Sequence, residues 1–243
     1  MRKVLFFLLI SCGVLFADIR IPKPWNPGWF GPFGSSPAQR FSGLRLGISW
    51  TEPMDGVNCD GFGFFSEWGW RKYRLGASFA HTSLDSIYRS EAFGLEATIS
   101  PGFWNLGFSA QGEIQIIPGE AADFRAKISP GISAEWIRGR IGMWTNLYTD
   151  FEKNAYLAEA TFSPGKNFSA GVLLHYRQSD HFSFSVGEEF RLGVLWLQGS
   201  LSYPGPKVGI GIRLGWKRLS AAFGANRDGN YMDSQMFGFF SDF

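Results

Sequence analysis

The sequence predicts an all-β protein, a transmembrane antiparallel up-and-down β-barrel of about 14 strands, within a range of 12 to 16. Three observations predict this fold. Apolar residues recur at every second position along most of the chain. Gly, Pro, Asn and Asp interrupt this alternation at short intervals. The positions between the apolar ones hold mainly Gly, Ser, Thr, Asn and Gln, which suit an enclosed interior, whereas a soluble sandwich would present Lys, Glu and Asp to water on that face.

The clearest hairpin covers residues 155–177. Apolar side chains alternate with polar or small ones on both sides of the Ser-Pro-Gly-Lys-Asn segment at 163–167, which predicts a reversal of the chain. One face of this ribbon is apolar throughout: Tyr156, Ala158, Ala160, Phe162, Phe168, Ala170, Val172, Leu174 and Tyr176. Strands with one apolar face are the repeating unit of a barrel in lipid.

The N-terminus has the pattern of a secretory signal peptide, expected to cover residues 1–17. Arg2 and Lys3 precede an apolar run that is too short to cross a bilayer as a helix. We expect cleavage after Ala17. The alternative is lipidation at Cys12, because residues 9–12 are similar to a bacterial lipobox; the apolar residues that continue past Cys12 argue against it.

Residues 18–40 are expected to form an N-terminal arm that precedes the barrel at 41–243. The arm contains five prolines and no alternation, and proline cannot donate to a central β-ladder. Its aromatic residues leave two arrangements open. The arm is either a disordered lead-in outside the barrel or a segment folded into the lumen or under its rim.

The alternation predicts the strands in chain order. Polar loops are expected at 81–90 and 226–230, and Ser-Pro-Gly turns at 100–102 and 129–131. The expected strands are 41–51, 61–70, 73–79, 93–99, 104–116, 124–128, 132–149, 156–162, 168–177, 182–187, 195–202, 208–216, 219–223 and 231–243.

One of these stretches, 132–149, has two interpretations. The phase of its alternation changes near Arg138, which indicates either a turn or a β-bulge. A turn would give 15 strands and a bulge 14. Because a bacterial single-chain barrel usually has an even number of strands, the bulge is favoured.

The apolar face is rich in aromatic residues. Rings with an apolar body and a polar edge form girdles at both lipid–water boundaries of membrane barrels. The alternative is an aromatic core inside a secreted sandwich. Aromatic residues expected at strand ends include Trp50, Trp70, Tyr73, Trp104, Tyr176 and Trp216.

Charge and cysteine content exclude several functions. Without residues 1–17, basic and acidic residues are equal in number, and no basic patch indicates nucleic-acid binding. Cys59 would be the one remaining cysteine, which leaves no internal disulfide. The chain has no phosphate-loop, zinc or CxxC motif, so neither a cofactor nor a metal is expected.

Charged residues on the polar face are candidates for lining the lumen. Their mixed signs favour mutual pairing that fixes strand register, and a small excess of Lys and Arg from residue 125 onward would favour anions in a channel. The candidates are Arg45, Arg74, Glu113, Arg125, Lys127, His175, Arg177 and Arg213.

A hydrolytic function is the least favoured hypothesis. Outer-membrane phospholipases and lipid A deacylases use a Ser–His pair, which in this chain would be His175 or His181 with Ser183 or Ser185. No family motif surrounds these residues, and no third orienting group is evident from their spacing. We therefore expect no catalytic residue.

The C-terminal residues 235–243, QMFGFFSDF, resemble the terminal strand of Gram-negative outer-membrane barrels. Proteins of that class end in an aromatic residue, usually Phe, with apolar residues two apart before it, and the barrel-assembly machinery reads this strand as a signal. Phe237, Phe239 and Phe243 match, whereas Ser241 interrupts the pattern. The resemblance implies an outer-membrane location, with outer-membrane lipid and the assembly machinery as partners.

The tract at 208–240 also resembles the end of fatty-acid-channel-like barrels, including the shuttle barrels of type IX secretion. We expect a small passive channel or transporter for a solute that the sequence does not identify. The alternative is a non-conducting barrel that anchors or contacts other components of the envelope or of a secretion system.

Overall fold

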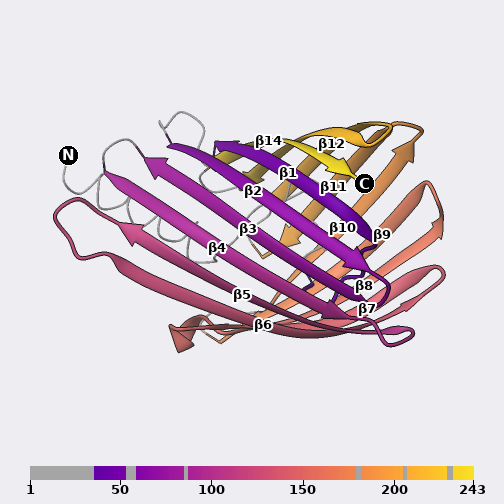
Figure 1. The fold of residues 1–243 in the computed structure, drawn as a ribbon, viewed down its shortest axis with the longest axis horizontal. Coiled ribbons are helices and arrows are strands. Elements are labelled where there is room, and N and C mark those ends of the chain that lie inside the picture. Colours follow the sequence, from indigo (N-terminus) through magenta and orange to yellow (C-terminus); the bar gives the residue numbers. More distant parts are fainter. Residues whose placement is uncertain (1–35, 53–58, 85–86, 179–181, 205–206, 229–231) are drawn as a thin grey trace.

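Fourteen antiparallel strands form one closed barrel, in which every strand pairs with its neighbours in sequence and β1 pairs with β14 (Figure 1). This confirms the predicted fold class and strand number. The computed structural model describes residues 36–52, 59–84, 87–178, 182–204, 207–228 and 232–243. The strands are β1 (Gly43–Glu52), β2 (Cys59–Trp70), β3 (Tyr73–Leu84), β4 (Tyr88–Ile99), β5 (Trp104–Ile116), β6 (Asp123–Trp136), β7 (Gly139–Tyr148), β8 (Ala155–Gly165), β9 (Phe168–Arg177), β10 (Ser183–Leu192), β11 (Leu195–Tyr203), β12 (Lys207–Trp216), β13 (Leu219–Asp228) and β14 (Met232–Asp242).

The first and last strands close the barrel. The Leu44 N–H donates to the Phe243 carbonyl at 3.1 Å, and the Phe243 N–H donates to the Leu44 carbonyl at 2.7 Å. The terminal phenylalanine therefore continues the ladder between β14 and β1. Closure leaves no free sheet edge, which is the condition for β-strands in lipid.

The apolar rows face outward. On β1, Ile48 and Trp50 are 52% and 47% exposed, whereas Ser49 and Thr51 between and after them are buried. The six girdle candidates are also outward and 43–72% exposed. Because the aromatic rows do not pack between two sheets, the aromatic-core sandwich is wrong.

Two predictions about the middle of the chain are wrong. Ser129-Pro130-Gly131 is not a turn but part of β6. The pairing of β6 with β7 is interrupted there, between Ile128 and Gly131, so Pro130 lies where no ladder donor is needed. The phase change near Arg138 is a turn at 137–138 rather than a bulge. The two errors compensate, which keeps the number of strands at 14.

The strands also extend further than the alternation indicated. β3 continues to Leu84 and β4 begins at Tyr88, so most of the loop expected at 81–90 is strand. β13 likewise continues to Asp228. Polar residues near these strand ends hide the alternation, although the backbone remains paired.

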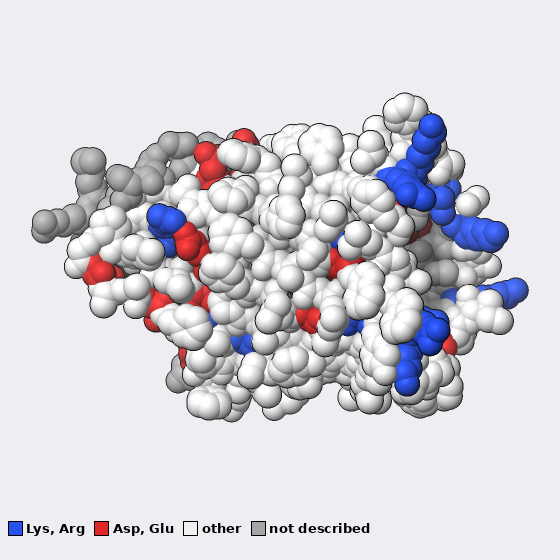
Figure 2. Space-filling view, viewed as in Figure 1, with Lys and Arg blue, Asp and Glu red and all other residues white. Residues whose placement is uncertain are grey.

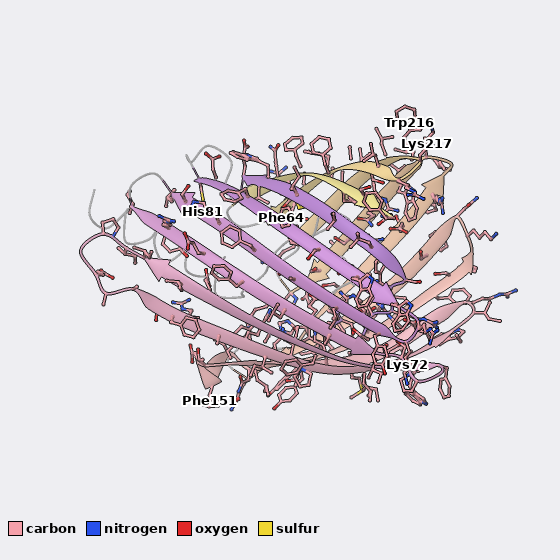
Figure 3. All side chains as sticks on the ribbon, in the orientation of Figure 1. Phe64, Lys72, His81, Phe151, Trp216 and Lys217 are labelled. Atoms are coloured by element: carbon pink, nitrogen blue, oxygen red, sulfur yellow. The ribbon has the colours of Figure 1, made fainter. Side chains whose placement is uncertain are left out.

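The barrel has two distinct ends. Turns of two residues, and one of four, join the strands at one, called here the turn end, where β1 begins and β14 ends; connections of three to six residues join them at the other, the loop end. A short 3₁₀-helix, η1 (Phe151–Lys153), lies in one loop. Lys72 and Lys217 mark the turn end, and His81 and Phe151 mark the loop end (Figure 3). No helix among the described residues is long and apolar enough to cross a membrane.

Candidate functional site

The lumen has two different walls. Inward side chains of β2 to β7 are mostly buried, among them Glu67, Arg74, Asn105, Glu113 and Ser133. Every inward side chain of β9 to β11, in contrast, is partly or fully exposed. One side of the lumen is therefore filled, and the other side is open to solvent.

The described end of the N-terminal arm fills part of the first wall. Ser36 and Ala38 are buried. The Thr98 hydroxyl donates to the Pro37 carbonyl at 2.8 Å, and the Ser133 hydroxyl donates to the Ala38 carbonyl at 2.8 Å. Of the two arrangements left open, residues 36–40 adopt the one inside the lumen. Residues 18–35 of the arm, and the expected signal peptide, lie outside the described residues.

Close packing of the arm and of the residue that follows it requires glycine on two strands. A Cβ atom on Gly107 of β5 would overlap the Pro37 carbonyl and the Ala38 nitrogen. A Cβ atom on Gly69 of β2 would overlap the backbone of Phe41. The arm thus passes against the wall at points where any side chain would displace it.

Arg74 joins the arm to the wall. Its Nη2 donates to Glu67 Oε1 at 2.7 Å and also to Glu96, and its Nη1 donates to the Thr98 hydroxyl at 3.3 Å. The same Nη1 lies 3.4 Å from the Pro37 carbonyl oxygen. The Arg74 and Glu67 side chains are 3% and 5% exposed, so this ion-pair network is almost fully removed from solvent.

Arg45 extends the network towards the closing strand. Its Nε donates to Asp242 Oδ1 at 2.5 Å, and its Nη1 lies 3.8 Å from Glu67 Oε2. Its guanidinium carbon lies 4.5 Å from the centroid of the Phe41 ring. Arg45 is therefore neutralised by two carboxylates and covered by the first residue of the barrel region.

Arg213 lies on the inward face of β12, on the open side of the lumen. Its guanidinium carbon lies 3.3 Å from the centroid of the Trp196 ring and 5.6 Å from that of Phe240. Arg191 lies over Trp196 as well, at 4.6 Å. Within the described part of the chain, Arg213 makes no hydrogen bond or ion pair, so its positive charge is held by aromatic rings and is not cancelled by a contacting carboxylate.

Three other candidates lie together on β5 and β6. The Glu113 carboxylate accepts a hydrogen bond from the Ser90 hydroxyl. Arg125, which is opposite Glu113 in the ladder, donates instead to Asp123 Oδ2 at 3.0 Å. Lys127 is buried with its Nζ 5.8 Å from the Tyr148 ring. These residues belong to the filled wall.

His175 and Arg177 lie on the inward face of β9, on the open side. The structure brings His175 and Ser183 together, with 3.2 Å between Nδ1 and Oγ. Both residues belong to the ladder between β9 and β10, which occupies backbone N–H groups that an oxyanion hole would need. Ser185 pairs with Ser202 instead at 2.7 Å, and His181 lies outside the described residues.

Several inward residues escaped the sequence analysis. Arg140 forms a buried ion pair with Glu159, but it lies at the phase change that was interpreted as a bulge. Trp144 and Trp196 are aromatic residues on the inward face, where polar residues were expected. A strict count of alternate positions from the turns at 137–138 and 193–194 would have found all three. No group of three or more His, Cys, Asp or Glu side chains suited to a metal occurs in the described ranges.

Of the comparisons with known proteins, the one with solved structures bears on the fold. No protein-family model matches the chain, and no curated protein matches it in sequence. A solved structure described as "Asymmetric conductivity of engineered proteins" is similar with a TM-score of 0.50 and 8% identity, over 82% of this chain and 99% of that one. A triple mutant of Rhodopseudomonas blastica porin is similar with a TM-score of 0.48 and 10% identity, over 82% and 98%. At 8% identity, the similarity to the first of these structures shows the fold alone.

Proposed function

We propose that this protein spans the outer membrane and conducts small solutes along the β9–β11 side of its lumen. The observation that carries the proposal is the difference between the two walls. The arm and a buried ion-pair network fill the side formed by β2 to β7, whereas the inward side chains of β9 to β11 are accessible to solvent. The channel is therefore narrow and one-sided.

The outward surface supports the membrane location. Its large apolar side chains are exposed around the whole barrel, including Leu95 at 66% and Met143 at 63%. Exposed apolar area on this scale is unfavourable in water and expected in lipid. The resemblance of the last strand to outer-membrane barrels supports the same location.

The open wall also supports a preference for anions. Arg191 and Arg213 lie there over one tryptophan ring, and Arg177 lies on the same side. Arg213 makes no ion pair within the described residues, and a cation in that situation raises the local concentration of anions in a narrow aqueous path. The solute class that fits this wall is a small anion.

Conductance of the purified protein in a planar bilayer tests the channel directly. We expect discrete current steps that are small for a barrel of this strand number, because the arm occupies part of the cross-section. A silent protein that is correctly folded and inserted would contradict conduction. It would favour the rival function, a barrel that anchors or contacts other envelope components, which the partly filled lumen also supports.

Loosening the arm is expected to widen the channel. The double variant Thr98→Val and Ser133→Ala removes two hydrogen bonds to the arm, worth about 2 kcal/mol together. We therefore expect larger steps, or transitions to a larger state, in single-channel recordings. The matched control is Ser129→Ala on β6, whose hydroxyl bonds to Asn146 and not to the described residues of the arm. Equal conductance in both variants would contradict the role of the arm.

The last residue is expected to matter for assembly. Phe243→Ala retains the backbone bonds to Leu44 but removes a ring that is 57% exposed. We expect several-fold less folded barrel in the outer membrane, measured by heat-modifiable mobility. Phe103→Ala, which removes a ring of similar exposure (60%) from a turn, is the control. Equal yields of the two variants would argue against a terminal assembly signal.

The hydrolase hypothesis is the least supported by the site. We expect neither phospholipid nor lipid A to be cleaved, because the Ser183–His175 contact lies within a paired ladder. Hydrolysis that is lost on His175→Ala would overturn this expectation.

A further inference from the structure

The turn end of the barrel carries a ring of basic side chains. Six turns, at 71–72, 100–103, 137–138, 166–167, 193–194 and 217–218, join the strands there. They contain no acidic residue. Figure 2 shows Lys and Arg gathered at this end and Asp and Glu mostly towards the other. The exposed basic residues of these turns, called here the basic rim, are Arg71, Lys72, Arg138, Lys166, Lys217 and Arg218.

The charges of the basic rim are not neutralised within the described residues. No member of the rim forms an ion pair with a described carboxylate. At the loop end, in contrast, three basic residues are paired with neighbouring acids: Arg89 with Glu91, Arg125 with Asp123 and Lys153 with Asp150. The rim therefore presents a net positive surface, and the loop end does not.

Aromatic rings set the depth of the rim in a bilayer. Four of its members lie 4.6–5.9 Å from the centroid of an outward ring. Trp and Tyr rings locate at the level of lipid headgroups, which places the three cations beside them at the level of the phosphates. The pairs are Arg71 with Trp70, Lys72 with Tyr73, Lys217 with Trp216 and Arg218 with Phe243.

The geometry of two turns shows that the basic residues are not there for the turn itself. Arg71 and Lys217 have φ angles of 52° and 56°. Glycine or asparagine adopts this left-handed conformation more readily and is the usual choice in two-residue hairpin turns. The turn conformation therefore does not itself favour a basic side chain at either position.

We propose that the basic rim binds anionic phospholipid headgroups of the leaflet at the turn end. Unpaired cations at phosphate depth attract anionic lipid electrostatically, and the adjacent rings provide an apolar surface for the upper acyl chains. The inference rests on the proposed membrane location but not on conduction. An acidic protein that docks on the rim from the aqueous side is the competing occupant, and the experiment separates the two.

The test compares lipid preference in vesicles. Full-length mature protein is inserted into phosphatidylcholine vesicles that contain either brominated phosphatidylglycerol or the same fraction of brominated phosphatidylcholine. Quenching of tryptophan fluorescence then reports which lipid contacts the barrel. The rim variant is Arg71→Gln, Lys72→Gln, Lys217→Gln and Arg218→Gln. The control variant makes the same change in net charge at the loop end: Arg89→Gln, Arg125→Gln, Lys153→Gln and Arg227→Gln.

We expect the wild-type protein and the control variant to prefer phosphatidylglycerol about fivefold, with the preference weakened by salt. The rim variant should show no preference while retaining its rings. Equal quenching by both lipids in the wild-type protein would overturn the proposal and favour the acidic partner. An equal loss of this lipid preference in the rim variant and the control variant would also overturn the proposal, because the net charge of the protein would then explain the preference. Failure to float with vesicles would contradict the membrane location itself, which distinguishes the two proposals.

Discussion

Arg74→Ala is expected to destabilise the barrel by about 3–5 kcal/mol, the usual cost of removing one partner from a buried ion pair. The substitution removes the cation that joins the Glu67 and Glu96 carboxylates in a region that excludes solvent, and Glu67 keeps only the longer contact with Arg45 at 3.8 Å among its ion pairs with described residues. It also removes donors to the Pro37 and Gln39 carbonyls of the arm. Urea unfolding in detergent micelles, followed by heat-modifiable mobility, measures the loss.

A triple variant that also removes the two acidic partners separates electrostatics from packing. Arg74→Ala combined with Glu67→Gln and Glu96→Gln should recover much of the lost stability, because no buried charge is left unpaired. Arg213→Ala is the control, since its guanidinium makes no ion pair in the described residues and its removal should cost far less. If Arg74→Ala and Arg213→Ala cost the same, the network around Arg74 does not stabilise the fold as described.

Arg213→Glu is expected to change the ion selectivity of the channel from anions to cations. The Arg213 charge lies on the open wall, held at 3.3 Å over the Trp196 ring. A unit charge about 4 Å from a permeating ion contributes about 1 kcal/mol even in bulk water, so reversing its sign should alter relative permeability more than about tenfold. The reversal potential in a salt gradient measures this ratio.

The control for selectivity is Arg138→Glu, which makes the same charge change in a turn outside the lumen. Arg213→Gln should give an intermediate reversal potential. An unchanged potential in Arg213→Glu would show that ions do not pass near β12. A shift of equal size in Arg138→Glu would assign selectivity to the surface charge of the barrel end.

The sequence could predict on which face of a strand a residue lies, but not which residues its side chain contacts. The period of two placed His175 and Arg213 on the inner face, because that period is a local property of a strand. The partners of Arg74 depend on the register of β2, β3 and β4 together, which no local pattern specifies. The position of residues 36–38 in the lumen depends on glycine at position 107, whose role is visible only in three dimensions.

The errors of the sequence analysis also arise because local composition does not show how strands and side chains pack together. Ser129-Pro130-Gly131 has the composition of a turn, yet the interrupted pairing between β6 and β7 accommodates the proline inside a strand. The stack of Arg213 on Trp196 contradicts the simple rule of a polar interior. A large ring can occupy the inner face where a cation covers it, and composition alone does not show this.

The central claim is that the barrel faces lipid on its outside and conducts through its lumen. The most direct measurement of this claim compares neighbouring positions on one strand, in a background with Cys59→Ser. Ser185→Cys places a thiol on the inward face of β10, and Val186→Cys places one on the outward face. We expect a charged, water-soluble thiol reagent to reduce the single-channel current of Ser185→Cys and to leave that of Val186→Cys unchanged. Block through Val186→Cys, with none through Ser185→Cys, would contradict a barrel that faces lipid outside and conducts within.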